Sequence, residues 1–318
     1  MNNLSREEFL KLSAMGLAAI PLLGMKALED ANVAALNQEP KVHLFSKHLQ
    51  FLDYDKMSKA AAELGFNGLD VTVRKGGHVA SENVDRDLPK VVQAMQSYGL
   101  TPELITTNIT NALAPETENI LQTASQLGFK NYRMGWLEYS EAHSIPESIE
   151  KFKVQFAALE LLNKKLKLTG TYQNHAGLHV GAPIWDIYQI IKDRDPNYIA
   201  TQYDIRHALV EGGTSWALGL RLIQSHIKCI VIKDFKWGQE EGVWKPINVP
   251  LGEGMVDFSA YFKLLKKYHL NNIPMSLHCE YDLGGAEHGD KEISISKEAV
   301  FKRIKKDLEF LKNAWQRS

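Results

Sequence analysis

Four strand-like apolar stretches in the second half of the chain each end in a cluster of polar residues. Helical stretches separate them, and the clusters hold side chains suited to proton transfer or cation binding: Gln173, His175, Asp204, Lys233, His278 and Glu280. Catalytic groups at the carboxyl ends of successive parallel strands are the pattern of a (β/α)8 barrel active site. The chain is therefore predicted to be an enzyme. The four stretches span residues 168–175, 199–204, 229–234 and 275–280.

Cationic and aromatic side chains are predicted at the same mouth of the barrel. Arg74 and His78 follow the second predicted strand, and Arg133 and Trp136 end the fourth. A cation beside an aromatic ring suits a sugar or a carboxylate, because ring faces stack on the apolar faces of sugars. These four residues are candidates for substrate binding, together with His207, which has a neighbour-orienting role as its alternative.

A glycine-flanked loop and two tryptophans lie in the long segment before the last strand. The glycines around Glu253 allow the backbone of residues 252–254 to approach a ligand, with a plain turn as the alternative. We include Glu253 among the candidate substrate-binding residues. Trp237 and Trp244 belong to a predicted insertion over residues 236–256, where they form a lid or only fasten the insertion.

The elements that position these residues alternate between strand and helix to the end of the chain. Helices are predicted to end at Gly65, Gly99 and Gly128, since glycine favours the left-handed conformation that closes a helix. Eight strand–helix units in one unbroken chain favour a single α/β domain, a (β/α)8 TIM barrel over residues 39–318, rather than an open doubly wound sheet. The first four strands are predicted at 42–45, 68–73, 102–106 and 132–136, and their helices at 55–64, 87–98, 115–127 and 146–166.

The first 38 residues differ from the rest of the chain. A polar start is followed by an apolar run over residues 12–25, which is too short to span a bilayer but suits a signal peptide. Residues 5–11 resemble a twin-arginine export signal in which Glu7 stands where the second arginine belongs. We therefore expect a periplasmic or exported protein. The alternative is an amphipathic helix packed on the barrel, in a cytoplasmic protein.

Composition and charge exclude several classes of partner. The 318 residues are 44% hydrophobic and carry a net charge of −1, which gives no basic surface for nucleic acid. The chain contains two cysteines, Cys229 and Cys279, which are predicted to be buried free thiols because their positions along the strands differ. No P-loop, dinucleotide glycine motif or serine nucleophile motif is present, so nucleotide hydrolysis, NAD chemistry and acyl transfer have no support.

Several motifs, taken in order, resemble those of the sugar phosphate isomerase/epimerase family within the xylose-isomerase-like TIM barrel superfamily. The resemblance covers residues 41–315 and is specific for the superfamily rather than for one reaction. It implies a TIM barrel that acts on a small sugar or glycoside. The motifs are FNGLD at 66–70, YQNHAG at 172–177, YDIRHA at 203–208, IKD at 232–234, VPLGEG at 249–254 and EY at 280–281.

The metal ligands that this resemblance implies are only partly present. The family binds one divalent metal, such as Mn, Mg or Zn, through Glu, Asp, His and Glu from four strands. In this chain the first glutamate falls on Gln173 and the histidine on Val231, while Asp204 and Glu280 are retained. A metal held by Asp204 and Glu280, with His175 as a nitrogen ligand, therefore remains one interpretation. The other is that the ammonium of Lys233 replaces the metal and pairs with Asp204 or Glu280.

The reaction implied by the resemblance is proton transfer next to a carbonyl of a sugar or keto-sugar. Glu280 is the expected base, and Lys233, His175 or a metal stabilises the oxyanion; Gln173 cannot serve as a second base. Isomerisation or epimerisation, and elimination by a keto-glycoside lyase or dehydratase, both remain open. A carbohydrate-binding barrel without catalysis is a third alternative. No compact basic cluster indicates a phosphate, which favours an unphosphorylated substrate.

Overall fold

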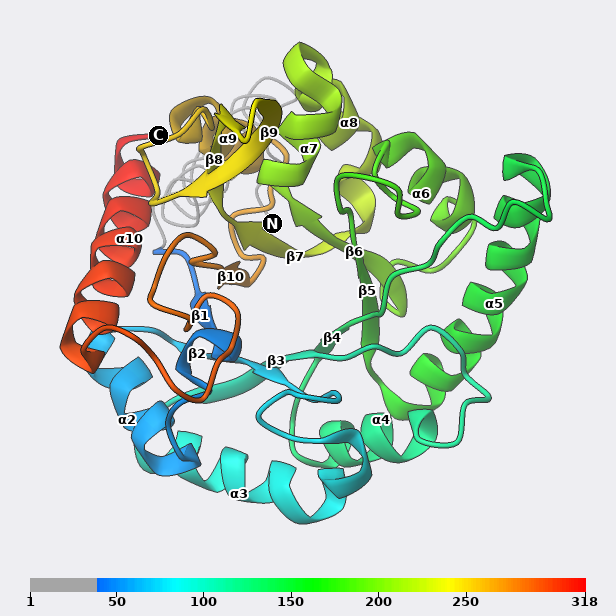
Figure 1. The fold of residues 1–318 in the computed structure, drawn as a ribbon. Coiled ribbons are helices and arrows are strands. Elements are labelled where there is room, and N and C mark those ends of the chain that lie inside the picture. The colour runs from blue at the N-terminus through cyan, green and yellow to red at the C-terminus, as the bar shows by residue number, and fades with distance from the viewer. Residues whose placement is uncertain (1–38) are drawn as a thin grey trace, which may run out of the picture. The chain divides into compact units, whose positions relative to one another are not determined.

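The computed structural model describes residues 39–318, which form one compact unit from Pro40 to Ser318. Parallel strands close into a barrel in the order β1-β10-β7-β6-β5-β4-β3-β2, as Figure 1 shows. The predicted TIM barrel is confirmed. The barrel strands are β1 (Val42–Phe45), β2 (Gly68–Thr72), β3 (Thr101–Thr106), β4 (Asn131–Arg133), β5 (Thr169–Gln173), β6 (Ile199–Asp204), β7 (Ile227–Ile232) and β10 (Met275–Leu277).

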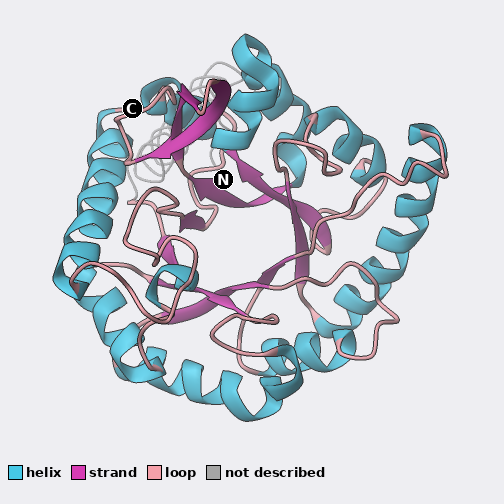
Figure 2. Ribbon diagram, in the orientation of Figure 1, coloured by secondary structure: helices cyan, strands magenta, loops and turns pink. Residues whose placement is uncertain are grey.

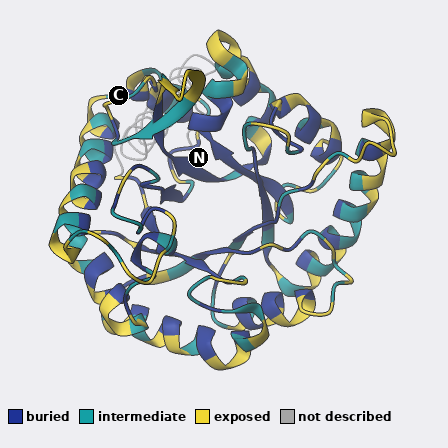
Figure 3. Cartoon of the chain, viewed as in Figure 1, coloured by how far each residue is buried: buried dark blue, intermediate teal, exposed yellow. Residues whose placement is uncertain are grey.

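Helices form an outer ring around these strands (Figure 2). Their inward faces are buried and their outward faces exposed (Figure 3), as expected for amphipathic helices that cover a sheet. The helices are α2 (Tyr54–Leu64), α3 (Val84–Ser97), α4 (Thr117–Gln126), α5 (Ile145–Leu166), α6 (Ile184–Ile191), α7 (Ile205–Gly212), α8 (Trp216–Ile223), α9 (Phe258–Lys267) and α10 (Lys297–Arg317). Short 3-10 turns lie at Ser46–Leu49, Ser81–Asn83, Gly213–Ser215 and Gln224–His226.

The ends of the helices follow the local chemistry that the sequence predicts. Gly65, the C-cap of α2, has φ 97°, and Gly99 and Gly128 also adopt positive φ just after α3 and α4. Helix α5 begins with a capping box in which the Ser144 hydroxyl accepts from the Glu147 N–H, while the Glu147 carboxylate accepts from the Ser144 N–H. Such signals are local, so they can be read without knowing the fold.

The barrel interior is closely packed, and most residues of its strands are buried. All five residues of β2 are buried, as expected for a sheet covered on both faces. A side chain at Gly170 would bring its Cβ to 2.7 Å from the Tyr132 hydroxyl. The glycine therefore leaves room for Tyr132, whose hydroxyl donates to Asn163 Oδ1 at 3.1 Å.

The segment before α9 forms an antiparallel hairpin outside the barrel. It consists of β8 (Asp234–Glu240) and β9 (Val243–Val249), so the predicted insertion is present and begins two residues before the predicted boundary. Trp237 and Trp244 are 44% and 64% exposed. At the base of the hairpin, Asn248 accepts from Arg206 Nε at 3.0 Å and donates to the Glu280 carbonyl at 3.3 Å, which ties the hairpin to α7 and to the end of β10.

Three other expectations have different outcomes. The fourth strand ends at Arg133 rather than Trp136, because the Gly135 N–H bonds the Ile109 carbonyl of a loop instead of a neighbouring strand, and a Cβ at Gly135 would lie 2.5 Å from the Asn108 carbonyl oxygen. Cys229 and Cys279 are buried free thiols, as predicted. The signal-like segment 1–38 lies outside the described residues, among which no helix is long and apolar enough to cross a membrane.

Candidate active site at the barrel mouth

The carboxyl ends of β6, β7 and β10 bring together the polar residues that the sequence singled out. Lys233 follows β7, and its Nζ lies 3.1 Å from Asp204 Oδ2 and 3.1 Å from Glu280 Oε2. The lysine side chain is 4% exposed and that of Asp204 is fully buried. A buried charge is tolerated only when it is paired, and here one ammonium is shared by two carboxylates.

Asp204 is held on every side by hydrogen-bond donors. Its Oδ2 accepts from Gln173 Nε2 at 2.8 Å and lies 3.1 Å from the Lys233 ammonium, and its Oδ1 accepts from the His207 N–H at 3.2 Å. The last of these bonds also caps the start of α7. Asp204 therefore combines the predicted role of a site carboxylate with that of a helix N-cap.

His207 lies against Lys233 and its proton can be placed from its neighbours. Nδ1 accepts from the Ala176 N–H at 3.1 Å and faces Arg206 Nη1 at 3.0 Å, and both of these groups can only donate. The pKa of His207 lies well below its usual value because of burial and the nearby Lys233 charge, so the ring is neutral. Its proton is thus on Nε2, which lies 3.1 Å from Lys233 Nζ and cannot accept from it.

The Lys233 ammonium consequently has one hydrogen more than its acceptors. It carries three N–H donors, and the groups around it offer two carboxylate oxygens, from Asp204 and Glu280. Because His207 Nε2 is itself a donor, the third hydrogen has no acceptor within the cluster.

Glu280 is the carboxylate of the cluster that solvent reaches. Its side chain is 24% exposed, and its Oε1 accepts from Lys47 Nζ at 3.0 Å. Burial alone would raise the pKa of Glu280, but Lys233, His278 and Lys47 outweigh it and hold this pKa well below the usual value. Glu280 is therefore ionised at neutral pH. The sequence prediction missed Lys47, although it lies just past the end of β1 and so belongs to the same mouth.

Arg133 and Trp136 lie side by side, next to Gln173. The Arg133 Cζ lies 4.5 Å from the centre of the Trp136 ring, and its Nη1 donates to Gln173 Oε1 at 3.1 Å. This bond and the donation to Asp204 fix the Gln173 amide, with its oxygen toward Arg133 and its nitrogen toward Asp204. The predicted pairing of a cation with an aromatic ring is present in the structure.

These residues do not fit a divalent metal. Where the family has ligating atoms, the amide nitrogen of Gln173 and the ammonium of Lys233 point donors at Asp204, and Val231 is apolar. Among residues 39–318, no three His, Cys, Asp or Glu side chains converge as a metal-binding group. Asp204, Glu280 and His175 thus do not form the predicted ligand set. His175 instead packs on His207 at 4.0 Å and its Nδ1 contacts the Ala176 carbonyl.

Two predicted substrate-binding residues have their polar atoms engaged by other groups of the protein. His78 contacts Ser46 Oγ through Nδ1 and the Leu49 carbonyl through Nε2, both at 3.2 Å, so it fastens two loops together. Glu253 is exposed and pairs with Lys306 at 2.7 Å, on α10. The loop around Glu253 approaches a carboxylate of the protein itself. Asp234 accepts hydrogen bonds from the backbone N–H groups of Gly252 and Gly254.

His278 and Arg74 lie at the mouth as predicted. His278 stacks on Phe45 at 4.0 Å, and its Nδ1 lies 3.8 Å from Glu280 Oε1. The guanidinium of Arg74 lies over the Phe45 ring, 5.8 Å from its centre. Below them is Asp70, a buried carboxylate that accepts from the hydroxyls of Thr106 and Ser276 at 2.9 and 2.7 Å. Asp70 was part of a quoted motif but was not predicted to belong to the site.

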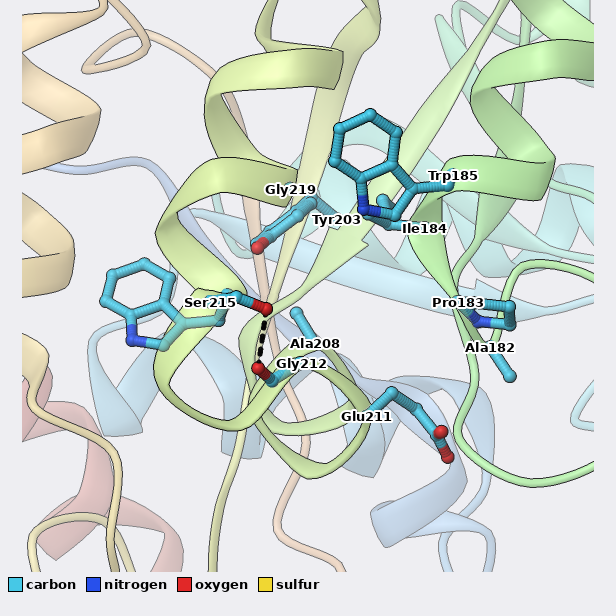
Figure 4. Close-up of a pocket in the computed structure, with 11 residues that line it drawn as sticks. Ala182, Pro183, Ile184, Trp185, Tyr203, Ala208, Glu211, Gly212, Ser215 and Gly219 are labelled. Atoms are coloured by element: carbon cyan, nitrogen blue, oxygen red, sulfur yellow. Dashed lines mark hydrogen bonds between the residues drawn. The ribbon is translucent and has the colours of Figure 1, made fainter.

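A separate cavity of about 100 Å³ lies outside the barrel, where α6, α7 and α8 meet. Its lining includes Trp185, Tyr203 and Glu211, and Ser215 donates to the Gly212 carbonyl at its edge (Figure 4). None of the acid–base residues of the mouth lines it. The acid–base residues therefore lie at the strand ends and not in this cavity.

Comparison with solved structures shows the same fold in sugar epimerases. An L-ribulose 3-epimerase superposes with a TM-score of 0.64 at 13% identity, covering 88% of this chain and 97% of that one. A D-allulose 3-epimerase from Methylomonas sp. gives 0.64 at 13% identity, covering 87% and 98%. A 3-keto-D-glucoside 4-epimerase from E. coli gives 0.61 at 14% identity, covering 86% and 100%.

The sequence comparisons agree with this fold. No curated protein sequence matches the chain. A profile of the xylose isomerase-like TIM barrel family matches residues 58–314, which is most of the barrel. The chain belongs to the xylose isomerase-like TIM barrel family.

Proposed function

We propose that the protein is a sugar isomerase or epimerase that transfers a proton next to the carbonyl of a keto-sugar. The observation that carries this proposal is the shared ammonium of Lys233 between Asp204 and Glu280 at the barrel mouth. Family membership and the structural likeness to three sugar epimerases support it. The active sites of TIM barrel enzymes lie at this end of the strands.

Glu280 is the proposed base. It is ionised, partly exposed, and its two oxygens are held by Lys47 and Lys233, so the carboxylate has a fixed direction. Removal of a proton from the carbon beside a carbonyl leaves negative charge on the carbonyl oxygen. The free N–H of Lys233 is placed to donate to that oxygen, which is the role a metal ion has in metal-dependent proton transfer. Gln173 is an amide and supplies no second base.

A one-base site is also compatible with elimination from a keto-sugar. After proton removal by Glu280, loss of a hydroxyl or alkoxy group from the next carbon, as water or an alcohol that takes up the proton held by Glu280, would give an unsaturated product. A probable 3-DHS dehydratase from Bacillus anthracis is among the similar structures, with a TM-score of 0.58 at 14% identity. The replacement of a second glutamate by Gln173 favours this alternative over an epimerisation that uses two bases.

The proposal is tested by solvent exchange with Glu280→Gln. In D2O, the wild-type protein is expected to catalyse incorporation of deuterium into a ketose or a 3-keto-glycoside, at the carbon beside the carbonyl. NMR measures the rate of this incorporation. Loss of the general base should reduce this rate by about 10²- to 10⁴-fold. Glu253→Gln, which alters an exposed carboxylate outside the site, is the control. Wild-type activity in Glu280→Gln would rule out this base, and the NMR product separates isomerisation from elimination.

A carbohydrate-binding barrel without catalysis remains the contrasting function. Sugar binding without deuterium incorporation or turnover across the same panel would establish it. The retained pair of carboxylates around Lys233 argues against it, because a binding site gains nothing from a partly exposed, ionised base held at two points.

A further inference from the structure

Arg133 has an unusual hydrogen-bond inventory for a buried guanidinium. The residue is 4% exposed, and its Nη1 is taken by Gln173. Its Nε and Nη2, by contrast, are buried and have no hydrogen-bond partner among the described residues. The neighbouring Trp136 Nε1 is also without a partner. Leaving a buried charged donor unpaired costs free energy, so an acceptor is expected at this place.

The unpaired edge of Arg133 has the shape of a carboxylate-binding fork. Nε and Nη2 lie on the same side of the guanidinium and present two parallel N–H groups. Elsewhere in this chain the same edge of Arg86 binds Asp87, with Nε to Oδ1 at 2.9 Å and Nη2 to Oδ2 at 2.6 Å. Arg133 offers the same pair of donors with no carboxylate to receive them.

Two arginines at the mouth, Arg74 and Arg133, lack the carboxylate partners that Lys47 and Lys233 have. Neither Arg74 nor Arg133 lies within 4.0 Å of a carboxylate of residues 39–318, and Asp70 is satisfied by hydroxyl groups. Burial, and secondarily Arg74, lowers the pKa of Arg133 to about 9, which still leaves it charged at neutral pH.

We propose that the substrate of this site carries a carboxylate, which the Nε–Nη2 edge of Arg133 binds while Arg74 adds its charge. The substrate class is then a sugar acid, such as a uronate or its keto derivative. This inference rests on the proposed function, since it places the acid group of the substrate across the mouth from Glu280 and Lys233. A phosphate would present similar oxygen atoms and is the other source of the same chemistry.

Equilibrium binding tests this inference without requiring turnover. The probes are D-glucuronate, D-glucose and D-glucose 6-phosphate, measured by isothermal titration calorimetry on the full-length wild type, Arg133→Met and Arg133→Lys. Wild type should bind glucuronate more tightly than glucose. Arg133→Met should weaken glucuronate binding by about 10- to 100-fold, as expected for the loss of a bidentate charge-assisted pair, and weaken glucose binding by a smaller factor, because the bond from Nη1 to Gln173 is lost as well. Arg86→Met, which removes an exposed arginine with the same edge, is the matched control.

The remaining outcomes separate the alternatives. Arg133→Lys keeps the charge without the fork, so partial recovery is expected, and its melting temperature shows whether the protein is folded. Stronger binding of glucose 6-phosphate than of glucuronate would assign the edge to a phosphate. Equal binding of glucose and glucuronate by wild type, or an equal loss of both in Arg133→Met, would overturn the inference. If the protein prefers glucuronate but catalyses no deuterium exchange, carboxylate binding by Arg133 is supported and only the proposed catalytic activity is refuted.

Discussion

At the scale of single residues, the site is organised around one ammonium shared by two carboxylates, where the sequence resemblance implied a metal. Asp204 and Glu280 are retained, while Gln173 donates to Asp204 and Val231 offers no ligand. The Nζ of Lys233 then lies 3.1 Å from an oxygen of each carboxylate. A lysine ammonium and a divalent ion both neutralise carboxylates, but the ammonium donates hydrogen bonds and the ion accepts lone pairs. The neighbouring groups must therefore differ, and Gln173 does.

This substitution can be reversed experimentally. The triple variant Gln173→Glu, Val231→His and Lys233→Ala restores the family's donor set, because Val231 lies opposite Asp204 in the β6–β7 register. It is expected to gain one bound Mn²⁺ per chain, measured by calorimetry and by elemental analysis. Lys233→Ala alone should bind Mn²⁺ weakly or not at all. Stoichiometric Mn²⁺ in wild-type protein would contradict the replacement, as would a folded triple variant that binds none.

The sequence predicts part of this cluster and misses part for a physical reason. Asp204, Lys233 and Glu280 could be grouped because they end successive strands, and parallel strands end at one edge. Lys47 and Asp70 were missed because their roles depend on barrel closure, which places β1 between β2 and β10. His175 was expected as a nitrogen ligand or oxyanion stabiliser, but it packs on His207 and its Nδ1 contacts the Ala176 carbonyl, because loop backbone contacts set the direction of its ring.

At the scale of elements, buried carboxylates fasten the loops behind the site. Asp234 accepts from the N–H groups of Gly252, Gly254 and Val256 and so fixes the turn that follows β9. Asp307 on α10 accepts from the Leu251 N–H at 3.2 Å through Oδ1, while its Oδ2 has no partner within residues 39–318. Burial raises the pKa of Asp307 to about 6, so this carboxyl is neutral in mildly acidic solution.

Asp307 should therefore make the stability of the barrel depend on pH. An acid whose pKa is raised by folding binds its proton more tightly in the folded state, so stability falls as pH rises from about 4 to 6 and then stays low. Asp307→Asn keeps the acceptor for Leu251 and cannot ionise. The free energy of unfolding of this variant should exceed that of wild type by about 2 kcal/mol at pH 7.5 and by little at pH 4. Thermal melting at both values measures this; an equal shift at both would exclude ionisation as the cause.

The boundaries of the elements were predictable to different degrees. Helix ends at Gly65, Gly99 and Gly128 follow from the conformation of glycine alone. The end of β4 could not be predicted in this way. Only glycine fits at position 135 because the Asn108 carbonyl of a different loop lies close to it. The hairpin of β8 and β9 was expected only as an insertion, because its exposed strands lack the apolar alternation of a half-buried sheet.

At the scale of the whole molecule, the near-neutral charge and the closed barrel suit a small-molecule enzyme. We further propose that the protein is exported, on the basis of the sequence of residues 1–38 alone. Expression of the full chain in a Gram-negative host should give a periplasmic form cleaved after about 38 residues, since the apolar run suits a signal peptide. Cell fractionation and intact mass measure both. A full-length protein confined to the cytoplasm would refute export.

The shared ammonium of Lys233 has one more consequence, for how copies of the protein become active. Lys233 is part of the polypeptide, so every copy of the protein carries this ammonium whatever metal ions its surroundings supply. The cation reaches Asp204 and Glu280 when β6, β7 and β10 align, because the three residues lie at the ends of those strands. Folding itself therefore places the ammonium between the two carboxylates, and no later binding of a cation is needed for that.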